Sequence, residues 1–382
     1  MTDATTLGTA AEAPPWRVLI VDDDATLRDY AVEYLSGLEL GGRKVGIEST
    51  ADFAEALAII ESRVLDLLIL DVYRGPAVND DQAGITVLEA LKARGFVGTV
   101  LFTAHPENVQ HLEGPFVRIV GKERAPFESI AKALAELVAT GIPAAHRNIS
   151  ILLDATLRDY MWEFVAKNWS ELHHMAASGD FERTVLRRMT ASLTRDRELA
   201  EDCIHPAEMY LMPPLGGNVS RLGDVRRRAV EHGVEYLVVI WPSCDLIQKD
   251  DRPTKVDSVI CAVASEAKQD DLVRSVIERP SKGNHSRLDQ TIGNRGEEHL
   301  CFLPGLCDLP DLLINLRRIE VVSLTSLSKC DRMATLASPF AEEVLSRFSR
   351  YIGRVGTPDL DSVQVKARMG VASLQPAQEA QS

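Results

Sequence analysis

The sequence predicts an N-terminal α/β domain, a doubly wound five-stranded parallel sheet, followed by a helical segment and an α+β domain with a small β-sheet or barrel. In the first third of the chain, short apolar runs rich in β-branched residues alternate five times with segments of helical period. Residues 18–21 and 67–70 are apolar throughout, as in strands that are buried on both faces. Beyond residue 205 the pattern becomes β-rich, which predicts the second domain.

The first domain is expected to span residues 16–140. Asp24 and Thr50 precede the first two helical segments, where each can cap the following helix. Sheets of this class place their functional sites at the carboxyl ends of the strands. The expected strands are 18–21, 45–49, 67–70, 98–103 and 116–120, and the expected helices are 25–36, 51–63, 85–94 and 126–140.

Polar residues follow these strands at their carboxyl ends. Asp22 and Asp23 follow the first strand, Asp71 the third, Thr103 the fourth and Lys122 the fifth. Three carboxylates in one crevice repel one another unless a cation is present, and Mg2+ suits such a site because it is a hard ion with oxygen ligands. A hydroxyl and an ammonium group opposite them suit a phosphoryl group, for which the central Asp71 is the expected acceptor.

The text around these residues resembles the receiver domain of bacterial two-component response regulators. RVLIVDDD, DLLILDVYRG, TVLFTA and VRIVGK occur in the order of that family and at near-family spacing, over residues 16–140. The resemblance implies a flavodoxin-like receiver in the cytoplasm that takes a phosphoryl group from a sensor histidine kinase or a phosphotransfer protein.

The resemblance also assigns roles to single residues. Asp71 would be the phosphoacceptor, and Thr103 and Lys122 would contact the phosphoryl group once it is attached. The Mg2+ cofactor would be held by Asp22, Asp23, Asp71 and the backbone carbonyl of Tyr73.

Tyr73 and His105 occupy positions that flank the path of the attacking water in receivers. Tyr73 could shield the acyl phosphate, and His105 could orient a water molecule or donate a proton near neutral pH. The alternative is that both side chains simply face solvent, and the sequence leaves the two interpretations open.

Three features depart from the receiver pattern. Ile119 stands where an aromatic residue is usual, and Glu123 replaces the usual proline, the nearest proline being Pro126. The fourth helix is expected to be very short, because only HPENVQHLEG is available for it. The loop after Asp71 is longer than usual and contains VYRGPAVNDDQAG. We therefore expect intact phosphorylation chemistry with a remodelled output face, and the oligomeric state stays open.

Residues 141–148 mix Gly, Pro and small side chains and are predicted to form a linker, followed by a helical connector over 149–200. Two helices are expected there, with a turn at 177–180. The second contains Arg183, Arg187, Arg188, Arg195 and Arg197, which fit either a DNA recognition helix or a solvated face balanced by nearby acids. The absence of a helix-turn-helix pattern favours the solvated face.

The α+β output domain is predicted over residues 201–360, and residues 1–15 and 361–382 are expected to be disordered tails. Its expected strands are 235–241, 256–264, 299–303 and 312–324, and a final helix is expected over 339–352.

Residues 222–246, LGDVRRRAVEHGVEYLVVIWPSCDL, resemble the opening of the SH3-like barrels of growth-inhibiting toxins and of receiver proteins from bacterial defence and stress systems. Residues 223–225 are interpreted as a turn. If the resemblance holds, Ser243, Cys244 and Asp245 lie at a strand end, where a ligand or nucleophile could be presented. The alternative is a turn with a buried thiol, since free cysteine is among the most buried residues.

Charge and composition limit the remaining function classes. The net charge is −14, and residues 1–140 carry 12 basic and 22 acidic residues, so −10 of it lies there. The rest of the chain is nearly neutral, so a basic surface for DNA is not expected. Six scattered cysteines are too few for a disulfide scaffold, and no apolar stretch is long enough to span a membrane.

The sequence thus predicts a cytoplasmic response regulator that signals through a non-standard output module. No glycine-rich nucleotide loop, GxSxG or HExxH motif is present, so no enzymatic activity is expected beyond the receiver's own phosphorylation and dephosphorylation. Two alternatives stay open: a receiver-gated nuclease or nucleotide-acting enzyme of a bacterial defence system, and a module that binds a protein partner or DNA when phosphorylated.

Overall fold

The computed structural model describes residues 13–62, 64–75, 82–123, 125–176, 179–198, 203–214, 219–231, 233–246, 254–354 and 360–370. The predicted tails therefore lie largely outside the described residues. The chain divides into two units, Met1–Ala200 and Glu201–Ser382, which we describe separately.

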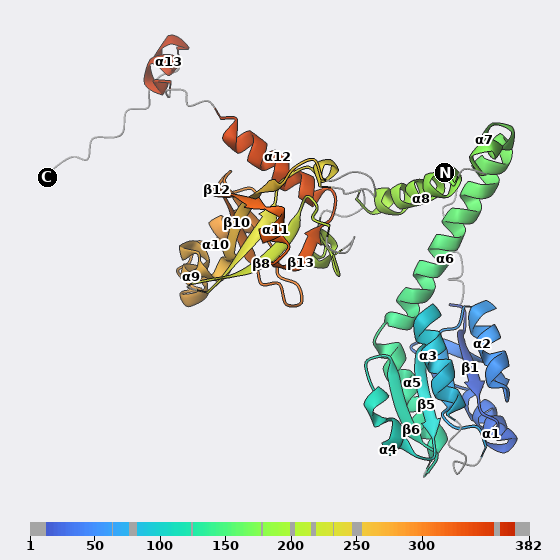
Figure 1. The fold of residues 1–382 in the computed structure, drawn as a ribbon. Helices are drawn as coiled ribbons and strands as arrows, with labels where there is room; N and C mark the ends of the chain where they lie inside the picture. Colours follow the sequence, from blue (N-terminus) through green and yellow to red (C-terminus); the bar gives the residue numbers. More distant parts are fainter. Residues whose placement is uncertain are drawn as a thin grey trace, which may run out of the picture. The chain divides into compact units, whose positions relative to one another are not determined.

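The N-terminal unit is built on a six-stranded sheet of order β2-β3-β1-β4-β5-β6 (Figure 1). Five of the strands pair in parallel, as predicted, and the two-residue β2 adds an antiparallel edge that the sequence pattern did not reveal. Every residue of β4 and β5 is buried, which explains why the sequence of each strand is almost entirely apolar. The strands are β1 (Trp16–Val21), β2 (Glu39–Leu40), β3 (Arg43–Thr50), β4 (Leu67–Asp71), β5 (Gly98–Thr103) and β6 (Val117–Gly121).

Helices cover both faces of this sheet. Helices α1 and α5 pack on one face and α2 and α3 on the other, because successive strand residues point to opposite sides. Asp24 caps α1 as predicted, but Thr50 does not cap α2: Asp52 accepts the hydrogen bond from the Ala54 amide instead. The helices are α1 (Ala25–Leu35), α2 (Phe53–Ser62), α3 (Ala83–Arg94), α5 (Pro126–Ala139) and the short α4 (Pro106–Val109) with the 3-10 turn Gln110–Leu112.

The linker predicted over 141–148 is wrong, because these residues begin a long helix, α6 (Ile142–Tyr160). Gly141 takes a left-handed conformation with φ of 74° and ends α5, and Pro143 stands in the first turn of α6, where proline is tolerated. Gly141 and Pro143 thus mark the junction between α5 and α6. The helix continues through a π-helical turn (Met161–Val165) and a 3-10 turn (Ala166–Asn168) into α7 (Trp169–Ala176), and α8 (Asp180–Glu198) follows.

The C-terminal unit is a seven-stranded antiparallel sheet of order β11-β12-β10-β9-β8-β13-β7. Where β12 pairs with β10, the register shifts between Asn315 and Ile319, and this bulge bends the long strand. The strands are β7 (Tyr210–Leu211), β8 (Asp224–Val230), β9 (Gly233–Val239), β10 (Ser258–Glu266), β11 (Leu300–Leu303), β12 (Leu312–Ser323) and β13 (Asp331–Leu336).

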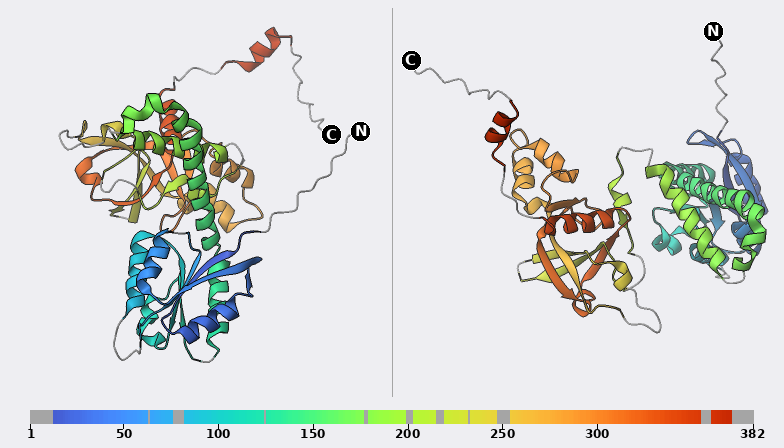
Figure 2. Two further views of the ribbon diagram at one scale, coloured as in Figure 1. Left: turned by 90° about the vertical axis from the view of Figure 1, so that its right-hand side faces the viewer. Right: turned by 90° about the horizontal axis from the view of Figure 1, so that it is seen from above.

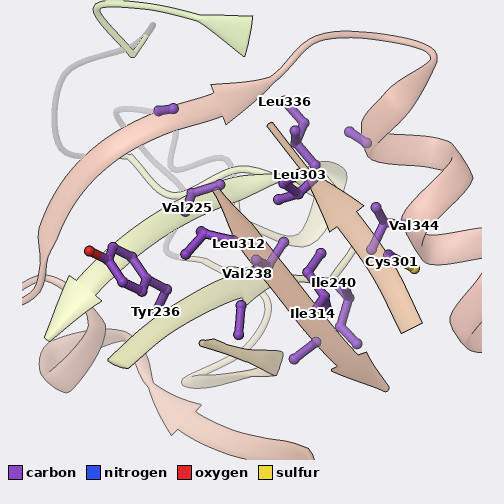
Figure 3. Close-up of a cluster of buried hydrophobic side chains, with 14 of the residues drawn as sticks. Val225, Tyr236, Val238, Ile240, Cys301, Leu303, Leu312, Ile314, Leu336 and Val344 are labelled. Atoms are coloured by element: carbon purple, nitrogen blue, oxygen red, sulfur yellow. The ribbon is translucent and has the colours of Figure 1, made fainter. Parts of the chain in front are cut away.

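The main core of this unit lies between one face of the sheet and helix α12 (Phe340–Ile352), which lies across the strands (Figure 2). In Figure 3, Val225, Val238, Leu303 and Leu312 from four strands point into this core, and Val344 of α12 closes it. A second apolar cluster covers the other face of β9 and β10. The remaining helices are α9 (Asp271–Glu278), α10 (His285–Ile292), α11 (Leu324–Leu327) and α13 (Ser362–Arg368).

Three sequence interpretations of this unit are corrected. Residues 223–225 are not merely a turn, because β8 begins at Asp224. Strand β13 and helices α9 and α10 were not foreseen. Helix α13 lies inside the predicted C-terminal tail. Within the described residues, none of the helices combines the length and apolar character needed to cross a membrane.

Candidate functional site

Three carboxylates meet at the carboxyl ends of neighbouring strands in the N-terminal unit. Asp22 and Asp23 follow β1, and Asp71 is the last residue of the adjacent β4. Asp22 and Asp71 are buried and Asp23 is half-buried, and each offers an oxygen within 4.8 Å of the others'. Among the described residues this is the one such group of three acidic, His or Cys side chains.

Lys122 balances part of this charge. It follows β6, and its Nζ donates to Asp71 Oδ2 at 2.6 Å and to Asp22 Oδ2 at 2.9 Å. The ammonium also lies 5.0 Å from the centre of the Phe102 ring. One ammonium facing three carboxylates leaves a surplus of negative charge in the crevice.

The pKa values of Asp22, Asp71 and Lys122 are all shifted from their ordinary values. Burial raises the pKa of Asp71 to about 6 against the opposing effect of Lys122, and burial likewise raises the pKa of Asp22. Burial alone would lower the pKa of Lys122, but the carboxylates of Asp71 and Asp22 raise it. At neutral pH Asp71 is therefore mainly ionised and Lys122 fully protonated.

Backbone groups fix the carboxylates in place. The amide of Asp24 donates to Asp22 Oδ1 at 2.9 Å, and the amide of Gly75 donates to Asp23 Oδ2 at 2.7 Å. At the start of α3, Gly84 lies so close to the backbone of Asp71 that a Cβ there would lie 1.9 Å from the Asp71 carbonyl oxygen. The extended loop after Asp71 falls partly outside the described residues.

Thr103 and His105 lie beside this cluster at the end of β5. The Thr103 side chain is fully buried, and its Oγ1 accepts a hydrogen bond from the His105 amide at 3.2 Å. Because β4 and β5 pair in register, Thr103 directly follows the residue paired with Asp71. Its hydroxyl proton is thus available to an acceptor at the strand ends.

The alternative that Tyr73 and His105 both face solvent is wrong for Tyr73, which is buried. Its hydroxyl accepts a hydrogen bond from Asn108 Nδ2 at 3.0 Å, and its ring lies edge-on to the His105 ring at 6.2 Å. The His105 side chain is 45% exposed. Sequence reasoning missed Asn108, although its place in the shortened fourth helix put it next to the strand ends.

The donor set fits a divalent cation of the Mg2+ type. Carboxylate oxygens are the ligands that Mg2+ prefers, and a second positive charge would offset the surplus that Lys122 leaves.

The candidate residues of the other unit form a separate group. Ser243, Cys244 and Asp245 make a 3-10 turn after β9. Ser243 Oγ accepts from the Leu222 amide at 3.0 Å, and the hydrogen bond from Lys255 Nζ, 2.8 Å long, lowers the pKa of Asp245. Cys244 is exposed, so the interpretation as a buried thiol is wrong.

The basic residues predicted in the connector lie on α8. Arg183, Arg187 and Arg188 are exposed, and Arg183 pairs with Asp180 one turn earlier. Such a pair on a helix surface is typical of a solvated face. The side chains of Arg195 and Arg197 lie outside the described residues.

The chain was compared with protein families, curated proteins and solved structures. No protein-family model and no curated protein matches the chain. The similar solved structures include receiver domains, for example that of a putative LuxO repressor protein from Vibrio parahaemolyticus, which is 18% identical with a TM-score of 0.27 and covers 34% of this chain and 96% of its own.

Two further structures are similar. A CheY-like receiver domain protein from Methanospirillum hungatei is 24% identical with a TM-score of 0.26, covering 33% of this chain and 95% of its own. The response regulator protein TrrA from Thermotoga maritima, in complex with Mg2+ and BeF, is also 24% identical with a TM-score of 0.26, covering 32% of this chain and 98% of its own. These matches concern about a third of the chain and leave the C-terminal unit unaddressed.

Proposed function

We propose that the chain is a response regulator of a phosphorelay. Its N-terminal unit accepts a phosphoryl group on Asp71 from a sensor histidine kinase or a phosphotransfer protein, in a Mg2+-dependent reaction. The C-terminal unit then acts as a non-standard output module. The observation that carries this proposal is the convergence of Asp22, Asp23 and Asp71 with Lys122 at one edge of a parallel sheet.

The transfer requires an ionised Asp71. Its carboxylate oxygen attacks the phosphorus of the donor, a P–O bond forms, and the bond from phosphorus to the donor's histidine nitrogen breaks with its electron pair going to that nitrogen. Burial raises the pKa of Asp71 to about 6, which leaves the carboxyl mainly ionised at neutral pH. The burial of Asp71 keeps bulk water away from the acyl phosphate.

The other residues hold and stabilise the transferred group. Asp22, Asp23 and Asp71 would hold Mg2+ together with the carbonyl of Tyr73, and this ion would neutralise charge on the phosphoryl oxygens. Lys122 would pair with a phosphoryl oxygen, and the Thr103 hydroxyl would donate to another. Hydrolysis returns Asp71 to its free form, and the buried Tyr73 would slow the approach of water while the half-exposed His105 orients it.

Labelling of the full-length protein tests the proposal. Incubation with acetyl phosphate or carbamoyl phosphate and Mg2+ should add the mass of one phosphoryl group, and Asp71→Asn should abolish the gain because the amide is not a nucleophile. Chelation of Mg2+ should also abolish the gain in mass. Asp23→Asn should reduce it strongly. Intact-mass spectrometry gives the readout.

Asp24→Asn is the matched control. Asp24 adjoins the cluster in sequence, but its side chain only caps α1, a role that asparagine also fills. This variant should be labelled like the wild type. Labelling of the Asp71→Asn protein, or labelling that persists without a divalent cation, would contradict the proposal.

A further inference from the structure

The helices that follow the receiver sheet expose much apolar surface. Between Ile142 and Leu186, eleven large apolar side chains of the described residues are each at least 36% exposed, and Trp162 reaches 72%. Helices that are hydrophobic on several sides are normally buried. Within this helical segment, α6 to α8, only Pro143, Val165, Val185 and one charged residue, Arg147, are buried among the described side chains.

Five apolar residues of α6 and of the π-helical turn after it form one row. Ile149, Leu153, Leu157, Tyr160 and Phe164 follow one another at intervals of three or four residues, so they share one face of the helix; Tyr160 is half-buried and the other four are exposed. Such a row is the geometry of a seam between packed helices.

Helix α8 covers only a part of this surface. It packs beside the later turns of α6, and an open cavity of 410 Å³ between them is lined by Tyr160 and Phe164 from one side and Met189 and Leu193 from the other. Leu153 and Leu157 lie outside the lining of this cavity and remain 39% exposed. Leu186 of α8 is 63% exposed as well.

We propose that the helical hairpin of α6, α7 and α8 dimerises with the same hairpin of a second copy of this chain, forming a bundle of four helices. The two copies would present the same surface to each other around a two-fold axis, which is the commonest arrangement of homodimers. This dimer does not require phosphorylation of Asp71 and is therefore independent of the proposed function.

The exposed apolar side chains on this face supply a part of such an interface. Ile149, Leu152, Leu153, Leu157 and Phe164 are 39% to 57% exposed. A stable interface buries about 800 Å² on each partner, so polar side chains beside this row would supply the rest.

A second copy fits this surface better than the C-terminal unit of the same chain. A row of apolar residues on one helix packs best into the grooves of another helix. In the C-terminal unit the exposed apolar residues are scattered, as Ile277 of α9 and Val321 of β12 are, and the apolar face of α12 is already buried against the sheet. Helices α6 and α8 are the two longest among the described residues, and α6 carries the exposed apolar row.

The hairpin is also held firmly to the receiver sheet. Arg147 of α6 is buried, forms a short ion pair with Asp66 ahead of β4, and donates to the Pro15 carbonyl at 2.9 Å. A dimer formed through the hairpin would therefore hold two receiver domains together.

Sedimentation velocity of the full-length protein over a wide range of concentrations tests the proposal. The wild type should sediment as a species of twice the 42.0 kDa chain mass. Leu157→Glu and Leu153→Glu should each weaken the dimer by roughly a hundredfold or more, because an unpaired carboxylate is costly to bury. Each of these side chains is partly exposed in the single chain, so the monomer should tolerate the charge.

Ile277→Glu is the matched control, since it places the same charge on an exposed apolar position outside the hairpin. It should leave the dimer intact, and far-ultraviolet circular dichroism should show unchanged helicity in all three variants. A wild type that stays monomeric at every concentration, as it would if the C-terminal unit covered the face, would overturn the proposal. So would a dimer that both hairpin variants leave unchanged.

Discussion

At the scale of single residues, the candidate site combines negative charge with burial. Asp22 and Asp71 are both buried, and burial raises the pKa of each carboxyl although both accept a hydrogen bond from Lys122. The folded protein accepts this arrangement because the amides of Asp24 and Gly75 and the close approach of Gly84 hold the strand ends in place. Structures that keep such crowded charges commonly use them in function.

Gly84→Ala should damage the site without touching a carboxylate. The new Cβ would lie 1.9 Å from the Asp71 carbonyl oxygen, so either α3 or the end of β4 must move. Overpacking of this kind costs about 1–3 kcal/mol, and the shift of Asp71 should greatly reduce phosphoryl labelling. Urea denaturation and intact-mass labelling measure the two effects.

Gly95→Ala is the corresponding control at the other end of the same helix. Its Cβ would meet only Leu91 Cδ1, at 3.9 Å, which is an ordinary contact. Equal losses in the two variants would mean that α3 is sensitive to any added methyl group and that the contact with Asp71 has no special role.

At the scale of elements, helix α6 is joined to the sheet of the N-terminal unit through Arg147. The Arg147 guanidinium donates to Asp66 and to backbone carbonyls of Pro14 and Pro15, just ahead of β1. Burial raises the pKa of Asp66 in spite of this cation, as expected where a carboxylate is removed from water. The contact fixes the start of α6 against the edge of the N-terminal unit.

Arg147→Met should destabilise the N-terminal unit by about 3–5 kcal/mol, because removing one partner of a buried pair leaves the other charge buried and uncompensated. Chemical denaturation monitored by circular dichroism gives the change in unfolding free energy. Arg158→Met, on the same helix but paired with Asp159 at the surface, should change it by less than about 1 kcal/mol. A similar small change for Arg147→Met would show that the buried pair does not anchor α6.

At the scale of the whole molecule, the two units have separate cores and should unfold separately. The sheet of the N-terminal unit is packed between two layers of helices, whereas the main core of the C-terminal unit lies between its sheet and α12. Domains with their own cores can in principle fold alone.

Phe348→Ala should therefore lower only one of two unfolding transitions. Phe348 of α12 is buried in the main core of the C-terminal unit, and the truncation should cost about 3–5 kcal/mol there. Differential scanning calorimetry of the full-length protein should show that transition shifted and the transition of the N-terminal unit unchanged. Arg147→Met should give the opposite pattern, and a single transition that moves with both variants would refute separate units.

The sequence by itself determined the parallel sheet of the N-terminal unit and the positions of Asp22, Asp23, Asp71 and Lys122 at its edge. Both follow from local pattern, because apolar runs mark strands buried on both faces and parallel strands align their carboxyl ends. Only the tertiary structure decided which atoms meet. The contacts of Lys122 with Asp71 and of Asn108 with Tyr73 join residues 51 and 35 positions apart, so no local pattern records them.

Tertiary contacts also decided the formation of strand β8, which the sequence pattern did not predict. The text Asp224-Val-Arg-Arg-Arg looks polar, yet Asp224 and Arg226 are buried in β8, because Asp224 accepts hydrogen bonds from Arg226, Arg332 and Thr335. Two of these partners lie more than 100 residues away in β13. A charged side chain can be buried once a distant partner satisfies it, and that partner is visible only in the folded chain.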